Sequence, residues 1–392
     1  MRIALFAWET LHSIPVGGVA VHVTELAAAL QRRGHDVHVF CRIGPGQSGY
    51  DLRDGVHYHR CPLALHPDFV TEMNNMCNSF MWRVGETEKV IGGAFDIFHG
   101  HDWMCTKAIA QAKNNWGRRT VLTIHSTEYG RCGNNNYNGN CDRVRWVEAE
   151  GTYIADRVIT VSGVLADEVK WLYRVPDWKL RTVHNGINVH RFDGYIDPSI
   201  CRRTYGIGPT DPMALFVGRM SRQKGPDLLL EAVPYVLPHR WNAKFVFVGD
   251  GDMRWSLEQR AWHMGVAQAC RFLGGMNANS DLENIYKSAD VVCVPSRNEP
   301  FGIVVLEAWA AGKPVLATHN GGPREFVTHD RTGYLIYDNP GSVAWGIMQI
   351  FNNFDHARWM GEQGRATAAY GFSWDRIAGD TEGIYRELVW WC

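Results

Sequence analysis

Two carboxylates stand close to an expected helix start in the segment from residue 296 to residue 308. Glu299 and Glu307 are eight positions apart, and a helix is expected to begin near Gly302 or Ile303. The unpaired N–H groups of a helix N-terminus suit a diphosphate. Carboxylates accept hydrogen bonds from hydroxyls, so one could hold a sugar and the other a ribose. Taken alone, the segment equally fits a solvent-facing turn and a glutamate that interacts only with the helix dipole.

Two cations follow an expected strand in the segment from residue 216 to residue 225, namely Arg219 and Lys224. Cations at the carboxyl end of a strand suit a phosphate, which arginine binds as a fork and lysine as a point charge. They would also neutralise the charge of a diphosphate leaving group without a metal ion. The alternative interpretation is a solvated basic loop.

Two glycine pairs lie where a strand is expected to pass into a helix. Gly17 and Gly18 follow the first expected strand, and Gly321 and Gly322 open a later helix. Glycine lets backbone amides approach an anion or a sugar closely. Simple turns contain such pairs as well, so each pair alone is a weak signal.

The first half of the chain carries polar residues after two further strands. His101 follows an expected strand and opens a helix, and His125 lies at the end of another strand. Glu128, Arg131 and the asparagine-rich loop 134–138 follow His125. A histidine at such a place can donate a hydrogen bond to a sugar hydroxyl or to an oxygen at the reaction centre. We take His125, Glu128 and Arg131 as acceptor-side candidates. A helix-capping histidine and a surface loop are the alternatives.

Cysteine and histidine spacing favours no metal site. The ten cysteines are scattered, and neither a CxxC nor an HExxH pattern occurs. Cys132 and Cys141 bracket the asparagine-rich loop, and their spacing favours two ordinary thiols over a disulfide or a metal site. We expect no metal cofactor.

Short apolar strands alternate with amphipathic helices along the whole chain, which is typical of parallel sheets covered on both faces. The first series of strands is expected at 2–8, 37–41, 97–99, 120–125 and 157–162, with a helix from the glycine pair to about residue 33. The second series is expected at 214–218, 245–249, 271–273, 291–295 and 315–318, with helices at 226–237 and 304–311.

The 392 residues therefore predict an α/β protein with two doubly wound, Rossmann-like domains. We expect an N-terminal domain over 1–186, a C-terminal domain over 187–368, and a final helix over 369–392 that packs back on the N-terminal domain. Open parallel sheets bind ligands outside the carboxyl ends of their strands, so two such domains would face each other across a cleft.

Charge and hydropathy exclude several classes of protein. Lys and Arg number 40 and Asp and Glu 41, a net charge of −1, so no broad field attracts nucleic acid or anionic membrane. The longest apolar runs are far shorter than the ~20 residues of a membrane-spanning helix. With no secretory signal pattern at the start, we expect a cytoplasmic protein without an integral membrane segment. The sequence does not define an oligomeric state.

The combination of these motifs resembles the retaining glycosyltransferases of GT-B fold, family four, over nearly the whole chain. The spacing of Glu299 and Glu307 with Pro300-Phe301-Gly302 between them is its most specific element. The segments 100–103 and 123–126 are similar to bacterial and archaeal glycogen (starch) synthases. Where those synthases usually have Lys-x-Gly-Gly, this chain has Pro15-Val16-Gly17-Gly18.

The resemblance implies a role for each matched residue. Arg219 and Lys224 would bind the donor diphosphate, and Glu307 would hold the ribose hydroxyls. The donor sugar would be held by Glu299 and by the backbone around Phe301, Gly302 and Ile303. His101 would lie by the anomeric region of the sugar, and Gly17 and Gly18 would approach the phosphates or the acceptor. Glu299, His101, Arg219 and Lys224 would form the catalytic group.

The resemblance also implies a reaction, in which a hexose, first of all glucose, passes from UDP-glucose or ADP-glucose to a carbohydrate hydroxyl with retention of configuration. Elongation of an α-glucan is the primary hypothesis. The alternatives are a small-metabolite or lipid-linked acceptor, for which Trp171 and the pair Trp390-Trp391 would offer a membrane contact, and a non-catalytic sugar-binding protein.

Overall fold

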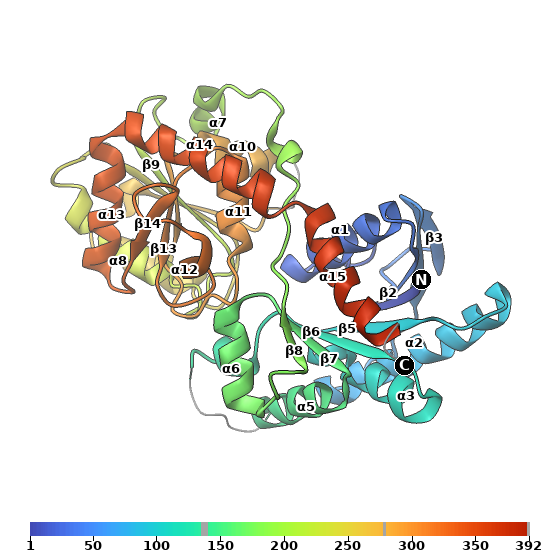
Figure 1. Ribbon diagram of the computed structural model, residues 1–392. Helices are drawn as coiled ribbons and strands as arrows, with labels where there is room; N and C mark the ends of the chain where they lie inside the picture. Colours follow the sequence, from blue (N-terminus) through green and yellow to red (C-terminus); the bar gives the residue numbers. More distant parts are fainter. Residues whose placement is uncertain (135–139, 277–279, 390–392) are drawn as a thin grey trace. The chain divides into compact units, whose positions relative to one another are not determined.

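The computed structural model describes residues 1–134, 140–276 and 280–389. The chain forms two compact units (Figure 1). Unit 1 comprises Met1–Asn185 together with the segment from Trp374 onward, and unit 2 comprises Gly186–Ser373. The second passage of the chain between the units thus lies at Ser373, a few residues beyond the expected limit at residue 368. The residues of the expected Trp390-Trp391 membrane contact lie outside the described part.

Unit 1 is built on an eight-stranded sheet with the order β3-β4-β2-β1-β5-β6-β7-β8. Its strands are β1 (Arg2–Ala7), β2 (Asp36–Arg42), β3 (Tyr50–Arg53), β4 (Val56–Cys61), β5 (Ile97–His101), β6 (Thr120–Ile124), β7 (Arg157–Thr160) and β8 (Leu180–Thr182). All neighbours are parallel except β3 and β4. Those two form a hairpin at one edge, closed by Asp54 and Gly55, which both have positive φ angles as a two-residue hairpin turn requires.

Helices cover this sheet. They are α1 (Gly18–Arg32), α2 (Phe69–Ile91), η1 (Trp103–Cys105), α3 (Thr106–Trp116), α4 (Glu128–Arg131), α5 (Asn140–Ile154), α6 (Gly163–Tyr173) and α15 (Trp374–Val389). Most buried strand residues are apolar, as a sheet covered on both sides requires, but several are polar, among them His38, His59 and His99.

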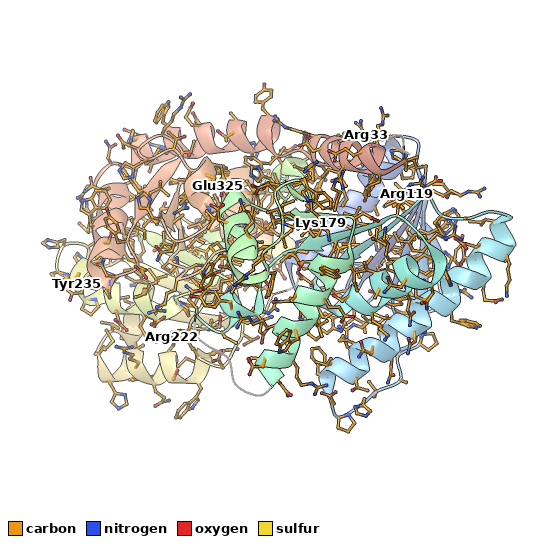
Figure 2. All side chains as sticks on the ribbon, turned by 60° about the horizontal axis from the view of Figure 1, so that its bottom comes forward. Arg33, Arg119, Lys179, Arg222, Tyr235 and Glu325 are labelled. Carbon is orange, nitrogen blue, oxygen red and sulfur yellow. The ribbon has the colours of Figure 1, made fainter. Side chains whose placement is uncertain are left out.

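The last helix, α15, packs beside α1 and contributes Trp374, Ile377 and Tyr385 to the core of unit 1. Two arginines labelled in Figure 2 bind this helix. Arg33 Nε lies 2.6 Å from a carboxylate oxygen of Glu382, and Arg119 Nε donates to the carbonyl of Leu388 at 2.7 Å. The C-terminal helix is therefore an integral part of unit 1.

Unit 2 is built on a six-stranded parallel sheet with the order β11-β10-β9-β12-β13-β14. Its strands are β9 (Met213–Val217), β10 (Lys244–Val248), β11 (Cys270–Gly274), β12 (Val291–Val294), β13 (Val315–Thr318) and β14 (Gly333–Ile336). Its helices are η2 (Val189–Phe192), α7 (Pro198–Thr204), α8 (Pro226–Val236), α9 (Arg254–His263), η3 (Ala267–Ala269), α10 (Ser280–Ser288), α11 (Ile303–Ala310), α12 (Pro323–Phe326), α13 (Pro340–Asn352) and α14 (Phe354–Gly371). The expected strands and helices of this half lie within a residue or two of the observed ones.

The order of the strands reverses once in each sheet. In unit 1 the chain extends outward from β1 through β2 and then returns to begin again at β5. In unit 2 the same reversal separates β9 from β12. Ligands of open α/β sheets bind at the carboxyl ends of the strands at such a point. We therefore expect a ligand-binding site at the loops that follow β9 and β12 in unit 2 and β1, β5 and β6 in unit 1.

Candidate active site

A lysine–glutamate pair joins the two loops at the reversal point of unit 2. Lys224 follows β9 and Glu299 follows β12. The Lys224 ammonium donates to both carboxylate oxygens of Glu299, at 2.9 and 2.8 Å. Ser296 Oγ donates to the same carboxylate at 2.9 Å. Because an ammonium has three N–H donors, one N–H of Lys224 stays available for a ligand.

Arg297 locks these two loops together. Its guanidinium forms two hydrogen bonds to the Asp227 carboxylate, at 2.9 and 2.6 Å, and a third to the carbonyl of Arg222 at 3.0 Å. Its backbone N–H donates to the carbonyl of Gln223 at 2.8 Å. Arg222, labelled in Figure 2, lies in the same loop as Lys224. A bidentate arginine–carboxylate pair fixes orientation as well as distance, so Arg297 and Asp227 position Lys224 against Glu299.

The glycine pair Gly321-Gly322 packs against the backbone that carries Glu299. Gly321 forms an isolated parallel bridge with Glu299, and the Gly322 N–H donates to the Glu299 carbonyl at 2.8 Å. A Cβ atom on Gly321 would lie 2.0 Å from that carbonyl oxygen. The sequence analysis expected the backbone amides of Gly321 and Gly322 to be exposed to a ligand. The Gly322 amide is instead hydrogen-bonded to the Glu299 carbonyl. Its glycines are required by a close approach of two backbones.

Helix α11 begins beside this pair. Gly302 is its N-cap with a φ of +100°, and Ile303 is its first residue. Phe301 is buried, with ring centroids 5.1 Å from Phe326 and 6.2 Å from Phe372. Its side chain therefore belongs to the core, so at Phe301 only the backbone is left to meet a ligand at the N-terminus of the helix.

Glu307 lies on α11 and is bonded to a different partner. The Tyr286 hydroxyl donates to its carboxylate at 2.7 Å. Burial raises the pKa of Glu307 above its ordinary value, and the Tyr286 hydrogen bond and nearby Arg191 oppose that rise. Arg191 itself is bonded to Glu283 at 3.1 Å. Glu307 is thus a half-buried residue whose carboxylate is oriented by Tyr286.

Arg219, the second expected cation, is exposed. Among the described residues, its guanidinium takes part in no hydrogen bond or ion pair. The two cations expected at this loop therefore differ in their surroundings. Lys224 forms an ion pair with Glu299, whereas the Arg219 side chain is exposed to solvent.

In unit 1, His101 and His125 end neighbouring strands and face each other. His101 Nδ1 lies 3.2 Å from His125 Nε2, and the His22 ring packs against both, with centroids 5.3 and 4.5 Å away. Burial lowers the pKa of all three imidazoles, that of His125 to about 3, so they are neutral at pH 7.

His101 is enclosed by the protein, with 1% of its surface exposed, whereas His125 is half-buried. The sequence analysis placed His101 by the sugar, and the Nε2 atom of this enclosed ring has no hydrogen-bond partner among the described residues. The His125 backbone N–H donates to Asp102 at 2.7 Å, and burial raises the pKa of Asp102 to about 6. Asp102 and His101 therefore hold His125 in place.

The other two acceptor-side candidates form an internal polar network. Arg131 donates to Glu128 at 2.8 Å and to Glu148 at 2.6 Å. Glu148 is buried and also accepts from the backbone N–H of Glu128 and from the Tyr173 hydroxyl. This network connects α4, α5 and α6. The residues of the asparagine-rich loop from 135 to 138 lie outside the described part.

The first glycine pair is tied to a glutamate that the sequence analysis did not select. Glu9, which follows β1, accepts from the backbone N–H groups of Val16 and Gly17, each at 2.6 Å. Burial raises the pKa of Glu9, and these two amides oppose the rise. The amide of Gly17 is thus already occupied. Gly18, the exposed first residue of α1, is the member of the pair that can meet a ligand.

Three groups of side chains in the described part bring ligand-type atoms within 4.8 Å of one another. They are His22 with His101 and His125, Asp36 with His38 and His57, and Glu128 with Cys132 and Cys141. Sequence spacing did not reveal them because each group combines different strands, helices or loops.

The chain belongs to the glycosyltransferases. The family model described as Glycosyltransferase Family 4 matches residues 16–191, and that described as Glycosyl transferases group 1 matches residues 200–367. An uncharacterized glycosyltransferase of Methanocaldococcus jannaschii is 38% identical over 98% of both chains. A glycogen synthase of Mycobacterium tuberculosis is 28% identical over 98% of this chain and 94% of its own. A D-inositol 3-phosphate glycosyltransferase of Saccharomonospora viridis is 30% identical over 95% of this chain and 90% of its own.

Solved structures define the fold more closely. Sucrose-phosphate synthase from Thermosynechococcus elongatus superposes over all of both chains with a TM-score of 0.83 at 22% identity. The catalytic domain of starch synthase IV from Arabidopsis thaliana, bound to ADP and acarbose, covers 99% of both chains with a TM-score of 0.78 at 18% identity. The two Rossmann-like units are therefore those of the GT-B fold. No helix within the described residues has both the length and the hydropathy needed to cross a membrane.

Proposed function

We propose that this chain transfers glucose from UDP-glucose or ADP-glucose to a carbohydrate hydroxyl, with retention of the anomeric configuration, and that it elongates an α-glucan. The observation that carries this proposal is the pair of Lys224 and Glu299 at the reversal point of unit 2, beside the N-terminus of α11. Glycogen synthase and starch synthase among the similar proteins support the acceptor class.

Unit 2 binds the nucleotide sugar in this proposal. The diphosphate accepts hydrogen bonds from the remaining N–H of Lys224 and from the Arg219 guanidinium. The first backbone N–H groups of α11 also donate to it. Glu299 orients Lys224 and accepts from a sugar hydroxyl with a remaining lone pair. Glu307, held by Tyr286, accepts from the ribose hydroxyls.

Unit 1 supplies groups for the sugar and the acceptor. His125 is the histidine that touches the sugar, and His101 is a positioning residue that acts through it. Gly18 offers its amide to a phosphate or to the acceptor. Glu128 and Arg131 shape the acceptor side through their network with Glu148 rather than through free charges.

The reaction breaks the bond between the sugar C1 and the diphosphate oxygen and forms a bond from C1 to the acceptor oxygen on the same face of the sugar. The departing diphosphate oxygen accepts the proton of the acceptor hydroxyl. Lys224 and Arg219 stabilise the negative charge that develops on this leaving group, a type of stabilisation worth about 2–4 kcal/mol for one preorganised donor. The proposed reaction uses neither a protein nucleophile nor a metal ion.

Nucleotide release by the purified protein tests this proposal. The protein is given UDP-, ADP- and GDP-linked sugars with and without a maltooligosaccharide. Release from UDP-glucose or ADP-glucose that requires the oligosaccharide supports an α-glucan synthase. NMR of the product should then show a new α-linkage, and a β-linkage would refute retention.

A small polar acceptor is the second candidate function. It is favoured by the D-inositol 3-phosphate glycosyltransferases among the relatives, which match nearly the whole chain. Release that ignores the maltooligosaccharide but responds to a phosphorylated polyol would establish it. A lipid-linked acceptor is tested in the same assay with a polyprenyl-phosphate sugar. No release with any donor would favour a non-catalytic sugar-binding protein.

A further inference from the structure

Two cysteine sulfurs lie in contact where α4 ends and α5 begins. Cys132 directly follows α4, and Cys141 is the second residue of α5. The Cys132 thiol donates to the Cys141 sulfur with the two sulfurs 3.4 Å apart. Both residues are half-buried, so small molecules can reach them. The sequence spacing favoured two ordinary thiols over a disulfide, and the structure has both as free thiols whose sulfurs are in contact.

The packing of α4 against α5 holds these sulfurs together. Glu148 in the middle of α5 accepts from the Glu128 backbone N–H at 2.9 Å and from Arg131 at 2.6 Å. Both donors belong to α4, and Glu148 is 1% exposed. A buried carboxylate with these partners fixes α4 against α5, so the positions of Cys132 and Cys141 follow from a rigid support.

The other described cysteines lack this combination of contact and access. Cys41, Cys61, Cys77, Cys105, Cys270 and Cys293 are buried, and Cys201 is half-buried. No other two cysteine sulfurs of the described chain are joined by a hydrogen bond. Thiol oxidation depends on access to the sulfur and on a partner thiol within reach.

We propose that Cys132 and Cys141 are a redox site, which a low-molecular-weight disulfide such as oxidised glutathione converts reversibly into an intramolecular disulfide. The Cys141 thiol loses its proton, and its sulfur attacks one sulfur of the glutathione disulfide, releasing one glutathione thiolate that takes up a proton. The Cys132 thiol then loses its proton and attacks the Cys141 sulfur, and the second glutathione leaves and is protonated. Two protein thiols are oxidised, and one disulfide is reduced to two thiols.

The order of these steps follows from the surroundings of Cys132. Burial, the contact with Cys141 and the nearby carboxylate of Glu128 raise the pKa of the Cys132 thiol to about 12. A raised pKa makes the Cys132 thiolate scarce, so Cys132 is placed second in the proposed exchange. The bond-forming step requires the sulfurs to approach from 3.4 Å to the ~2.05 Å of a disulfide.

The same atoms fit a zinc ion less well. Zinc–sulfur bonds of about 2.3 Å at a tetrahedral angle place two sulfurs roughly 3.8 Å apart, further than they are here. The third possible ligand, Glu128, already pairs with the Arg131 guanidinium at 2.8 Å, and this positive charge opposes a second cation. A raised thiol pKa also disfavours the thiolate that a metal requires.

Mass spectrometry of the full-length protein tests the proposal. The reduced protein is equilibrated with glutathione buffers of increasing oxidised fraction, quenched with an alkylating reagent and digested. We expect a peptide pair linked through Cys132 and Cys141, lighter by two hydrogen atoms, that disappears again on reduction. Cys132→Ser and Cys141→Ser should each abolish the link, whereas Cys201→Ser, the matched control at a half-buried cysteine in unit 2, should retain it.

Three results would overturn the inference. The first is alkylation of both cysteines at every glutathione ratio. The second is a glutathione adduct on Cys141 that persists in the presence of Cys132. The third is stoichiometric zinc in the freshly purified protein that Cys141→Ser removes. The inference does not depend on the proposed transferase activity, because the readout is the bond itself.

Discussion

Replacement of Lys224 by alanine should affect turnover and stability by different amounts. The change removes the cation proposed to stabilise the departing diphosphate, which is worth about 2–4 kcal/mol and lowers kcat roughly 30- to 1000-fold. It also leaves the Glu299 carboxylate with Ser296 as its remaining side-chain donor in the described structure. Breaking a buried ion pair costs roughly 3–5 kcal/mol. Because the Lys224 side chain is 29% exposed, solvent screens the pair, and we expect a loss of about 2 kcal/mol in the free energy of unfolding.

The two side chains of the Lys224–Glu299 pair differ in exposure, 29% against 8%, and this difference makes the prediction testable. Glu299→Gln leaves a partly exposed lysine, which water can solvate, so its loss of stability should be below about 1 kcal/mol. Its kcat should nevertheless fall as in Lys224→Ala, because Lys224 is no longer oriented. Arg222→Ala is the matched control, since it removes an exposed cation from the same loop and should change stability by less than about 0.5 kcal/mol.

Urea denaturation followed by tryptophan fluorescence gives the stabilities, and nucleotide release at saturating donor gives kcat. A Lys224→Ala protein that keeps near wild-type kcat would refute the diphosphate role. Equal losses of stability in Lys224→Ala and Glu299→Gln would refute the reasoning from burial, because that reasoning requires the buried partner to suffer more when left alone.

Three further outcomes follow from the described contacts. Glu307→Ala should weaken the affinity for free nucleotide in calorimetry about tenfold or more, the loss of a charge-assisted hydrogen bond, and unchanged affinity would contradict the ribose role. Gly321→Ala should destabilise the protein by about 1–3 kcal/mol, because its Cβ would lie 2.0 Å from the Glu299 carbonyl oxygen, whereas Gly371→Ala, with no atom within 4 Å, should not. The folded-state pKa of His125 is lowered to about 3 from 6.5, so its contribution to stability is present above pH 6.5 and is lost as the pH falls through 3. Urea titrations should therefore show declining stability from pH 6.5 downward, and a flat profile to pH 4 would contradict the burial of the imidazoles.

The sequence predicted the two Rossmann-like sheets and the loops that carry Lys224 and Glu299, because strand periodicity and glycine turns are local signals. It did not predict the β3–β4 hairpin, although Asp54-Gly55 is a hairpin-turn signal that could have indicated it. It selected both His101 and His125 as site candidates, but only the tertiary packing decides how far each ring is enclosed.

The supporting residues of the site could not be found in the same way. Arg297 and Asp227 are 70 positions apart and meet only when both loops are in place. Glu9 and Gly17 are close in sequence, but no sequence motif predicts that the Glu9 carboxylate accepts hydrogen bonds from the backbone N–H groups of this turn. Both of these contacts depend on how the backbone folds, and the spacing of residues in one sequence does not predict that.

The position of α15 has a consequence for the order of folding. Unit 2 is one continuous stretch of chain, whereas unit 1 requires a helix that the ribosome makes after unit 2. Trp374, Ile377 and Tyr385 bury side chains worth roughly 1.5–3 kcal/mol each, a sum comparable to the whole stability of a typical domain. Tyr385 also lies 2.6 Å from His99 Nδ1 in the central strand β5. During synthesis unit 1 therefore lacks α15 until unit 2 has been made, so unit 2 can complete its fold first. This reverses the usual order, in which the N-terminal domain folds first.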